Sequence, residues 1–376
     1  MVQTLDGSEV STLRWINERA VLRHLYEDDR AHSVAEIASA CALSRPTVEG
    51  ALVQLLQDGW VLETAPQASG KGAGRPAKRY TFADTVKVLL GVDLGPHGAT
   101  CVAATLRGER LATVRTGECD LSDGMEALNA VVRVIQQVLS EVGRNEHDVL
   151  ALTVGLPAIV EVDGRIALTV VVPRWQSFDL PRRIKERYSY AQVMFENDAK
   201  LATVAEHTWG AATGTRNMVN VLVGHRVAAG MIVDGRLARG IHGAAGEIGA
   251  FPAARWASAH RRWRSTGTST PPHETLSDRG TEDKSGPNEL QVFADDLAQG
   301  IAALCLVLDP EVVVIGGGIA QLGDRLIRPL SDSVAAITLF PVEMRVSDLG
   351  QSAVALGGIA HSRNHVAATV LEIDQR

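Results

Sequence analysis

The chain has 376 residues, 45% of them hydrophobic, which is enough apolar material for two or three domains with cores of their own. Its formal net charge of −7 excludes binding to nucleic acid through overall charge, so any contact with DNA has to come from a local basic patch. The cysteines are scattered without paired spacing, which argues against a disulfide or zinc framework and favours a reducing cytoplasm. No basic and apolar leader and no stretch of about 18 uncharged apolar residues is present, so we expect neither a signal peptide nor a membrane span.

The first part of the chain has helical patterning. Apolar residues recur close to helical spacing over 11–27, which predicts a first helix. Ser33 is followed three residues later by Glu36. This spacing is typical of a capping box, and it predicts a short helix over 34–41.

A second short helix follows after a brief turn. Ser44 can cap its start, and Pro46 falls in the first turn, where its missing N–H does no harm. Two short helices joined by a tight turn are typical of a helix-turn-helix, whose second helix enters the major groove with its N-terminal residues at base edges. The candidates for contact with DNA on this helix are Ser44, Arg45, Thr47 and Gln54.

A glycine-rich basic segment over 68–79 lies between two short apolar runs. Alone it would fit a flexible linker, but after a helix-turn-helix it predicts a wing. Lys71, Arg75 and Lys78 are its candidates for contact with DNA, and Arg75 in Gly-Arg-Pro suits a narrow minor groove with strong negative potential. We therefore expect a winged helix-turn-helix domain over 1–83.

The remainder of the chain alternates strands, glycine turns and helices, which predicts an α/β fold. We expect two similar lobes with a cleft between them, the first over 84–198 and completed by a C-terminal helix over 353–376, the second over 199–352. Ligands in such folds bind beyond the carboxyl ends of strands. The residues expected to converge at such ends are Asp93, Asp198, Glu247 and Gly316.

The stretch over 230–250 carries the densest group of glycines around a carboxylate. Asp234-Gly235 after an apolar run predicts a hairpin turn, because both positions tolerate positive φ. The glycines on either side of Glu247 let backbone approach a ligand closely, and the carboxylate can accept hydrogen bonds from two hydroxyls of a polyol. From composition alone, a glycine-rich surface loop is the favoured interpretation, and the rest of the chain has to decide between the two.

Several motifs in order give the chain a specific resemblance to a known family. They are Gly91-Val-Asp-Leu-Gly95, Glu196-Asn-Asp-Ala199, Val233-Asp-Gly-Arg-Leu-Ala-Arg-Gly240, Gly243-Ala-Ala-Gly-Glu-Ile-Gly249 and Ile315-Gly-Gly-Gly-Ile319. Together with the winged head, they make the chain resemble the ROK family of bacterial sugar kinases and sugar-responsive transcriptional regulators. The resemblance implies a two-lobed actin-like ATPase (ribonuclease H-like) fold. It also implies a regulator, because the kinases of the family lack the DNA-binding head.

Both phosphate-binding loops of the family kinases are altered here. Where those kinases continue their first motif with Gly-Thr, this chain has Pro96 and His97, and proline has no N–H to donate to a phosphate. The second loop, a Gly-x-Gly-x-Gly run in the kinases, begins here with Arg226 and keeps only Gly230. Side chains at these positions obstruct the approach of phosphate to backbone. We therefore expect no ATP cofactor and no sugar kinase activity.

The zinc site that the resemblance implies is also missing its ligands. The family places a histidine directly after Gly-Glu-Ile-Gly and cysteines soon afterwards, but this chain has Ala250 there and no cysteine over 251–290. We expect no metal, and the composition of this segment predicts a flexible, solvated insertion. His242, His260 and His273 are interpreted as surface residues rather than ligands.

The expected effector contacts come from the same resemblance. Asp198 matches the catalytic base of the kinases, which hydrogen-bonds sugar in the regulators, and a helix N-cap there would fit either role. Asn197 and Glu247 complete the set, and Arg174 lies in the neighbouring sugar loop. A cation there would suit a phosphorylated or acidic effector.

The expected function is therefore a cytoplasmic transcriptional regulator, a repressor that binds double-stranded operator DNA as a homodimer or homotetramer and responds to a sugar or sugar phosphate. Two alternatives stay open. One is an ATP-dependent sugar kinase with an appended DNA-binding head, which Asp198 and Glu247 support, and the other is a DNA-binding regulator with a vestigial pocket. The apolar helix expected over 301–308 is interpreted as core rather than as a dimer interface.

Overall fold

The computed structural model describes residues 7–64, 78–96, 98–169, 172, 175–224, 226–265 and 289–369. The chain divides into two compact units. The first comprises Met1–Leu89, Ala104–Glu109 and Arg363–Arg376, and the second comprises Leu90–Ala103 and Arg110–Ser362. The first unit thus reaches beyond the expected head and takes in short segments of the expected first lobe, while the rest of that lobe and the whole second lobe fall within the second unit.

The first unit holds three helices and a small sheet with strand order β1-β3-β2. Its elements are α1 (Gly7–Glu27), β1 (His32–Ser33), α2 (Val34–Cys41), α3 (Arg45–Gln57), β2 (Val61–Thr64) and β3 (Arg79–Phe82). The capping box of Ser33 and Glu36 is confirmed, as is the Ser44 cap of α3 with Pro46 in the first turn. Segment 104–109 joins this unit because the Arg107 guanidinium donates to the carbonyls at the end of α1, at 2.9 Å from Leu25 O.

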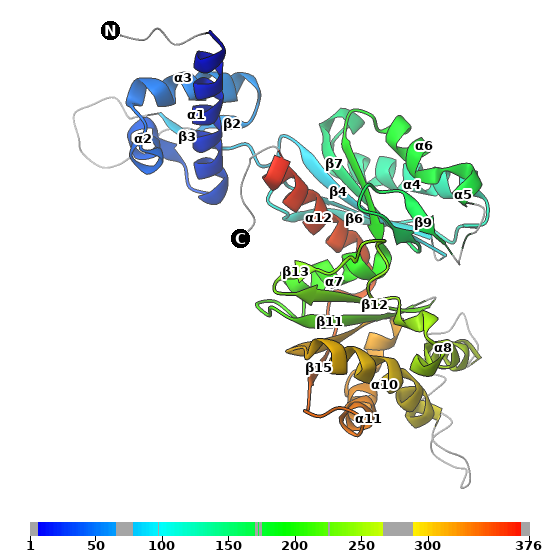
Figure 1. The fold of residues 1–376 in the computed structure, drawn as a ribbon. Coiled ribbons are helices and arrows are strands. Elements are labelled where there is room, and N and C mark those ends of the chain that lie inside the picture. The colour runs from blue at the N-terminus through cyan, green and yellow to red at the C-terminus, as the bar shows by residue number, and fades with distance from the viewer. Residues whose placement is uncertain are drawn as a thin grey trace. The chain divides into compact units, whose positions relative to one another are not determined.

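The first lobe of the second unit is built on a sheet with strand order β10-β7-β4-β5-β6 (Figure 1). Its strands are β4 (Val88–Gly95), β5 (Gly98–Ala104), β6 (Arg110–Arg115), β7 (Val149–Leu156) and β10 (Gln192–Asn197). The hairpin β8 (Ile159–Val160) and β9 (Ile166–Leu168) and the helices α4 (Gly124–Glu141), α5 (Trp175–Phe178), α6 (Leu180–Arg187) and α12 (Ala353–Thr369) complete it. β10 runs parallel to β7, as expected for strands that are followed by crossovers.

Helix α12 packs directly on this sheet through glycines. A Cβ on Gly91 in β4 would lie 2.0 Å from Ala355 O, and a Cβ on Gly358 would lie 2.9 Å from Gly91 Cα. The Thr153 and Ser362 hydroxyls hydrogen-bond at 2.8 Å beside this contact. Only residues without a side chain allow the helix and strand backbones to come this close.

The second lobe is built on a sheet with strand order β13-β12-β11-β14-β15. Its strands are β11 (Met218–Val223), β12 (Val227–Val233), β13 (Arg236–Leu237), β14 (Val312–Gly317) and β15 (Glu343–Val346), and its helices are α7 (Asp198–Trp209), α8 (Trp256–Ser265), α10 (Glu289–Leu308) and α11 (Asp324–Ala335). Short 3-10 turns lie over 248–250, 252–254 and 318–322. The predicted hairpin turn between β12 and β13 is confirmed, since Asp234 and Gly235 have φ of 50° and 76°.

Helix α10 forms the centre of the second-lobe core. Its inward side chains, among them Phe293, Leu297 and Ile301, pack against α11, α8 and β11. Helix α10 is long and apolar enough to cross a membrane, but 61% of its most apolar 18 residues is buried, as in the core helix of a globular lobe. The expectation of core for 301–308 holds for its first residues, whereas Val307 at its end is 87% exposed.

The insertion expected to be flexible and solvated is partly structured. Residues 251–265 form a 3-10 turn and helix α8, whose Trp256 is buried and donates from Nε1 to Leu297 O at 3.0 Å. The polar composition of this segment did not predict a helix, because α8 is rich in arginine and is anchored by a single large aromatic side chain. Residues 266–288 lie outside the described part of the chain.

Candidate functional site

The N-terminal turn of α3 presents the expected DNA-contacting residues to solvent. Ser44 and Arg45 are exposed, and Thr47 is half-buried with its hydroxyl 2.7 Å from that of Ser44. Val48 and Leu52 hold the opposite face of the helix in the core. Since the first turn of a recognition helix is the part that reaches base edges, this arrangement agrees with direct readout.

The other predicted contacts of the head have different surroundings. The Gln54 amide bridges two residues, donating to Asp58 Oδ1 at 2.9 Å and accepting from Arg14 at 3.3 Å. It therefore ties α3 to α1 and to its own C-terminus, and its contact with DNA stays a prediction. Lys78 forms an exposed ion pair of 2.8 Å with Glu63. The wing candidates Lys71 and Arg75 lie outside the described residues, so their role stays a prediction.

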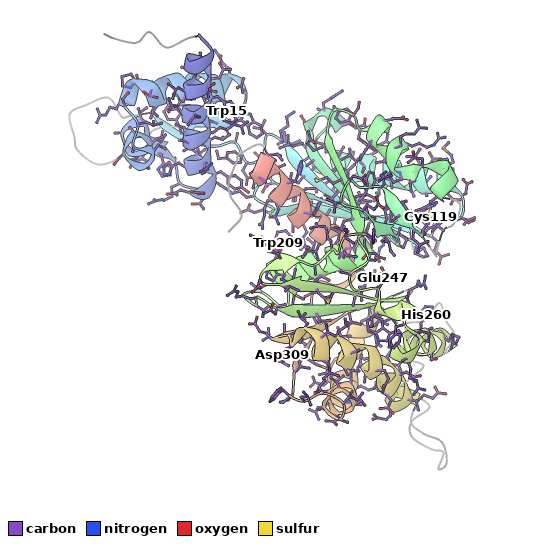
Figure 2. The ribbon with its side chains drawn as sticks, viewed as in Figure 1. Trp15, Cys119, Trp209, Glu247, His260 and Asp309 are labelled. Atoms are coloured by element: carbon purple, nitrogen blue, oxygen red, sulfur yellow. The ribbon has the colours of Figure 1, made fainter. Side chains whose placement is uncertain are left out.

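A cavity of about 350 Å³ in the second unit gathers most of the predicted effector residues. Its polar lining includes Asn197, Asp198 and Glu247, and its wall continues to Arg226 and α8. Figure 2 shows Glu247 between the two sheets and His260 on α8. A volume near the lower end of the roughly 300–1,000 Å³ range of ligand pockets suits a molecule of monosaccharide size. Arg174 lies outside the described residues.

Asn197 and Asp198 are oriented by the start of α7. The Asn197 side chain accepts from Lys200 N at 3.0 Å, so it is Asn197, rather than Asp198, that caps the helix. Its amide nitrogen donates to Ala158 O at 3.1 Å and to Asp198 Oδ1 at 3.0 Å, and Ala199 N donates to the same oxygen at 2.7 Å. One carboxylate oxygen of Asp198 is thus held by the protein while the side chain borders the cavity.

The acidic groups of the cavity are electrostatically coupled. Desolvation, aided by the charge of Glu247 and opposed by the hydrogen bond from Ala199 N, raises the pKa of Asp198 to about 6. Desolvation and the charge of Asp198 raise the pKa of Asp93 to about 7. The expected convergence at the cavity is observed for Asp198 and Glu247, whereas Asp93 and Gly316 are not among the residues that line it.

The loop that carries Glu247 is anchored at two points. Arg239 Nε lies 2.7 Å from the buried carboxylate of Glu196, and the fully buried Lys200 donates from Nζ to Gly243 O at 2.7 Å. The loop packs so tightly that a Cβ on Gly243 would lie 2.0 Å from Val160 O. These anchors were not singled out in the sequence, although Glu196 and Lys200 flank the Asn-Asp motif.

The altered phosphate loops border the same cavity. Pro96 lies in the turn after β4, and Arg226 lies in the turn between β11 and β12. Residues from Val227 onward belong to strand β12 rather than to a loop, and a Cβ on Gly230 would lie 2.1 Å from Thr203 Oγ1. Close packing against α7 therefore accounts for a glycine at position 230, and no phosphate-binding role is needed to explain it. His97 lies outside the described residues.

Helix α8 contributes wall residues that the sequence interpretation had assigned to the surface. Trp256, Ala257, His260 and Arg261 line the cavity, at positions that share one side of a helix. The half-buried His260 is thus a pocket residue, and its spacing from Trp256 was the signal that could have shown it. Within the described ranges no three His, Cys, Asp or Glu side chains are grouped so as to hold a metal.

Two family models match separate parts of the chain. The ROK family model matches residues 89–259 and 253–364, and the IclR helix-turn-helix domain matches residues 20–64. A putative xylose repressor of Caldicellulosiruptor sp. (strain Rt8B.4) is 24% identical, covering 93% of this chain and 95% of the relative. A glucokinase of Halalkalibacterium halodurans is 26% identical over 72% of this chain and 93% of its own length.

Solved structures of regulators and kinases share the fold. A ROK family transcriptional regulator described as a homolog of the E. coli MLC protein aligns with a TM-score of 0.65 at 18% identity, covering 96% of this chain and 98% of the other. A ROK hexokinase from Thermus thermophilus aligns with a TM-score of 0.59 at 24% identity over 74% of this chain and 99% of its own. The kinase alignment covers a smaller share of this chain than the regulator alignment does. The chain belongs to the ROK family.

Proposed function

We propose that the protein is a DNA-binding transcriptional repressor that is released from its operator by a sugar or sugar derivative bound in the cavity. One observation carries this proposal. The same chain has a recognition helix with an exposed start and a cavity with hydroxyl acceptors at Asp198 and Glu247. At the places where nucleotide phosphates would need backbone N–H groups or close approach, the cavity has Pro96 and Arg226. The repressors among its relatives, matched over nearly their whole length, support the same function.

We further propose that the protein acts in the cytoplasm as a homodimer or homotetramer. Two heads would then read an inverted repeat, with half-sites one helical turn or a multiple apart. Release requires the effector to bind more tightly to the state of lower operator affinity, because a ligand without that difference shifts no equilibrium. Sedimentation of the protein with and without operator DNA tests the assembly.

The function is tested by fluorescence-anisotropy titration with the DNA upstream of the protein's own gene. We expect tight binding that weakens as salt is raised and that one sugar or sugar derivative reverses. Tight binding that no compound of the panel alters would favour a regulator with a vestigial pocket. Absence of sequence-specific binding would contradict the proposal.

A sugar kinase with a DNA-binding head is the second candidate. The observation that favours it is the Asp198 carboxyl, whose pKa of about 6 is close to that of an effective general base and which borders the cavity. Pro96 and Arg226 argue against it for the reason given above. ATP hydrolysis that depends on an added sugar and is lost in Asp198→Asn would establish a kinase.

A further inference from the structure

One wall of the cavity carries basic side chains. The hydroxyl-accepting role of the cavity's carboxylates does not explain them. Besides Asp198 and Glu247, the lining contains Arg226, His260 and Arg261. A site for a neutral sugar needs only hydroxyl acceptors and donors of modest charge. Two arginines and a histidine in one small cavity therefore require an explanation.

The position of the α8 part of this wall is determined by buried anchors. Trp256 is 2% exposed and donates to Leu297 O. Arg255, with a φ of 59°, makes a 2.8 Å ion pair with Asp296, which is itself 1% exposed. These contacts fix the start of the helix, so that the side of α8 one turn further on, which carries His260 and Arg261, borders the cavity.

The two arginines of the wall are not neutralised by carboxylates of the protein. The Arg226 guanidinium has no hydrogen-bonding or ion-pair partner within the described ranges, and the partner of the Arg261 guanidinium there is the neutral Ser258 hydroxyl at 3.0 Å. In contrast, Arg239 and Arg255 in the same lobe are each paired with a buried acid. A guanidinium that keeps its donors unused at a cavity wall is suited to an anionic ligand, which it can bind through two parallel hydrogen bonds.

The turn after β4 strengthens this argument. Backbone N–H groups of glycine loops are the common means of binding a phosphate, but Pro96 lines the cavity here and has no N–H. At Pro96 of this turn, therefore, the backbone offers no donor to an anion, and side chains have to take its place. Arg226 and Arg261 are the exposed arginines that the lining provides for this.

We propose that the effector is a polyhydroxylated anion of monosaccharide size, whose hydroxyls bind Asn197, Asp198 and Glu247 and whose phosphate or carboxylate binds Arg226 and Arg261. This proposal rests on the proposed function, because it names the chemical class of the effector of the same cavity. His260 lies beside the anion and supplies either a neutral N–H donor or, when protonated, a further positive charge. The cavity volume of about 350 Å³ accommodates one sugar ring with one such group rather than a dinucleotide.

The test is isothermal titration of the full-length protein with matched sets of three compounds. Each set holds a neutral aldose, the same aldose phosphorylated at its terminal carbon, and the corresponding uronate. The variants are Arg226→Gln and Arg261→Gln, and the control is Arg165→Gln, which removes an arginine that is exposed, paired with Asp163 and absent from the cavity lining.

We expect at least one phosphate or uronate to bind about tenfold or more tightly than its neutral parent, and the two arms identify which anion it is. Each cavity variant should reduce the affinity for the anion by about tenfold, and so reduce the difference in affinity between the anion and its neutral parent. The control variant should bind both compounds as the wild type does. A neutral aldose that binds as tightly as its anionic derivatives, or an anion affinity insensitive to both variants, would overturn the proposal.

The outcomes for the effector class and for the repressor function are distinguishable. If a neutral aldose binds best and still releases the operator in the anisotropy assay, the anionic class fails and the repressor function stands. If an anion binds through Arg226 but leaves operator affinity unchanged, the anionic site stands and effector control of DNA binding fails. If no compound binds but the operator is still recognised, the anionic class fails together with the effector site.

Discussion

Lys200 and Gly243 are joined by a 2.7 Å hydrogen bond from the Lys200 ammonium to the Gly243 carbonyl, across 43 residues of sequence. Lys200 is fully buried in α7, and desolvation lowers its pKa while nearby carboxylates, first that of Glu196, oppose the shift. The bond ties the helix that begins with Asp198 to the loop that carries Glu247. This buried cation and the Arg239–Glu196 ion pair therefore together hold the two carboxylates of the cavity in place.

Substitution Lys200→Met should uncouple the two carboxylates while keeping the apolar stem. We expect effector affinity to fall by about tenfold or more and stability to fall by about 1–3 kcal/mol, because the Gly243 carbonyl loses its donor. Titration calorimetry and urea unfolding measure the two effects. The matched control is Lys185→Met at an exposed position of α6. Wild-type effector affinity in Lys200→Met would refute the positioning role.

The raised pKa of Asp198 predicts a pH dependence of stability. The pKa of this carboxyl is about 6 in the folded protein and roughly 3.9 in an unfolded chain. Ionisation of Asp198 therefore destabilises the folded state relative to the unfolded one. Its contribution to stability is therefore greatest below about pH 4, decreases between about pH 4 and 6, and stays low above that range. At about 1.4 kcal/mol per pKa unit, Asp198→Asn should be about 2–3 kcal/mol more stable than wild type at pH 7 and similar to it at pH 4.

Urea unfolding at a series of pH values from 4 to 7.5 measures this difference. The same series should show effector affinity rising as Asp198 ionises, since a carboxylate accepts two hydroxyl hydrogen bonds whereas a carboxylic acid must donate one. If the free energies of unfolding of wild type and Asp198→Asn differ by the same amount at all pH values, the pKa of the carboxyl is not raised by folding.

Two glycines inside helices should respond with opposite sign to the same substitution. A Cβ on Gly300 in α10 would lie 2.3 Å from Trp256 Nε1, whereas a Cβ on Gly50 in α3 would have nothing within 4 Å. Gly50→Ala should stabilise the head by about 0.5–1 kcal/mol, since alanine loses less backbone entropy in a helix. Gly300→Ala should destabilise by about 1–3 kcal/mol through overpacking against the anchor of α8.

Urea unfolding with separate probes for the head and the second unit measures both changes. Gly300→Ala should also weaken effector binding, because a displaced Trp256 moves the wall residues His260 and Arg261. A stabilising effect of Gly300→Ala would show that α8 yields without resistance, and the argument for a fixed cationic wall would then fail.

Arg45 is the exposed cation of the recognition helix start, and its loss should weaken operator binding. Arg45→Ala should reduce affinity by about 1–3 kcal/mol and relax the preference at one base pair if the guanidinium reads a base edge. A contact to phosphate would instead weaken all sequences equally and reduce the salt slope by about one. The control is Gln57→Ala, exposed at the other end of α3. Unchanged affinity in Arg45→Ala would remove α3 from the interface.

The accuracy of the sequence predictions differs between local elements and the site. Helices α2 and α3 begin at their predicted caps, and the hairpin turn at Asp234-Gly235 forms as predicted, because caps and turns are encoded within a few neighbouring residues. Strand β6 and the short helices α5 and α6 were not predicted, since brief elements carry too little periodicity. Gln54 was assigned to DNA on its exposed position, and only the structure shows its bonds to Arg14 and Asp58.

The sequence by itself determined the family, the two-part organisation of the chain, and the polar set of Asn197, Asp198 and Glu247, because each depends on residue types in a fixed local order. The tertiary structure decided which other residues share their cavity. The burial of Trp256 under α10 brings His260 and Arg261 to the wall, and the turn between β11 and β12 brings Arg226 there. Contacts between residues far apart in sequence depend on packing of whole elements, and no local pattern encodes the summed burial that selects one packing over another.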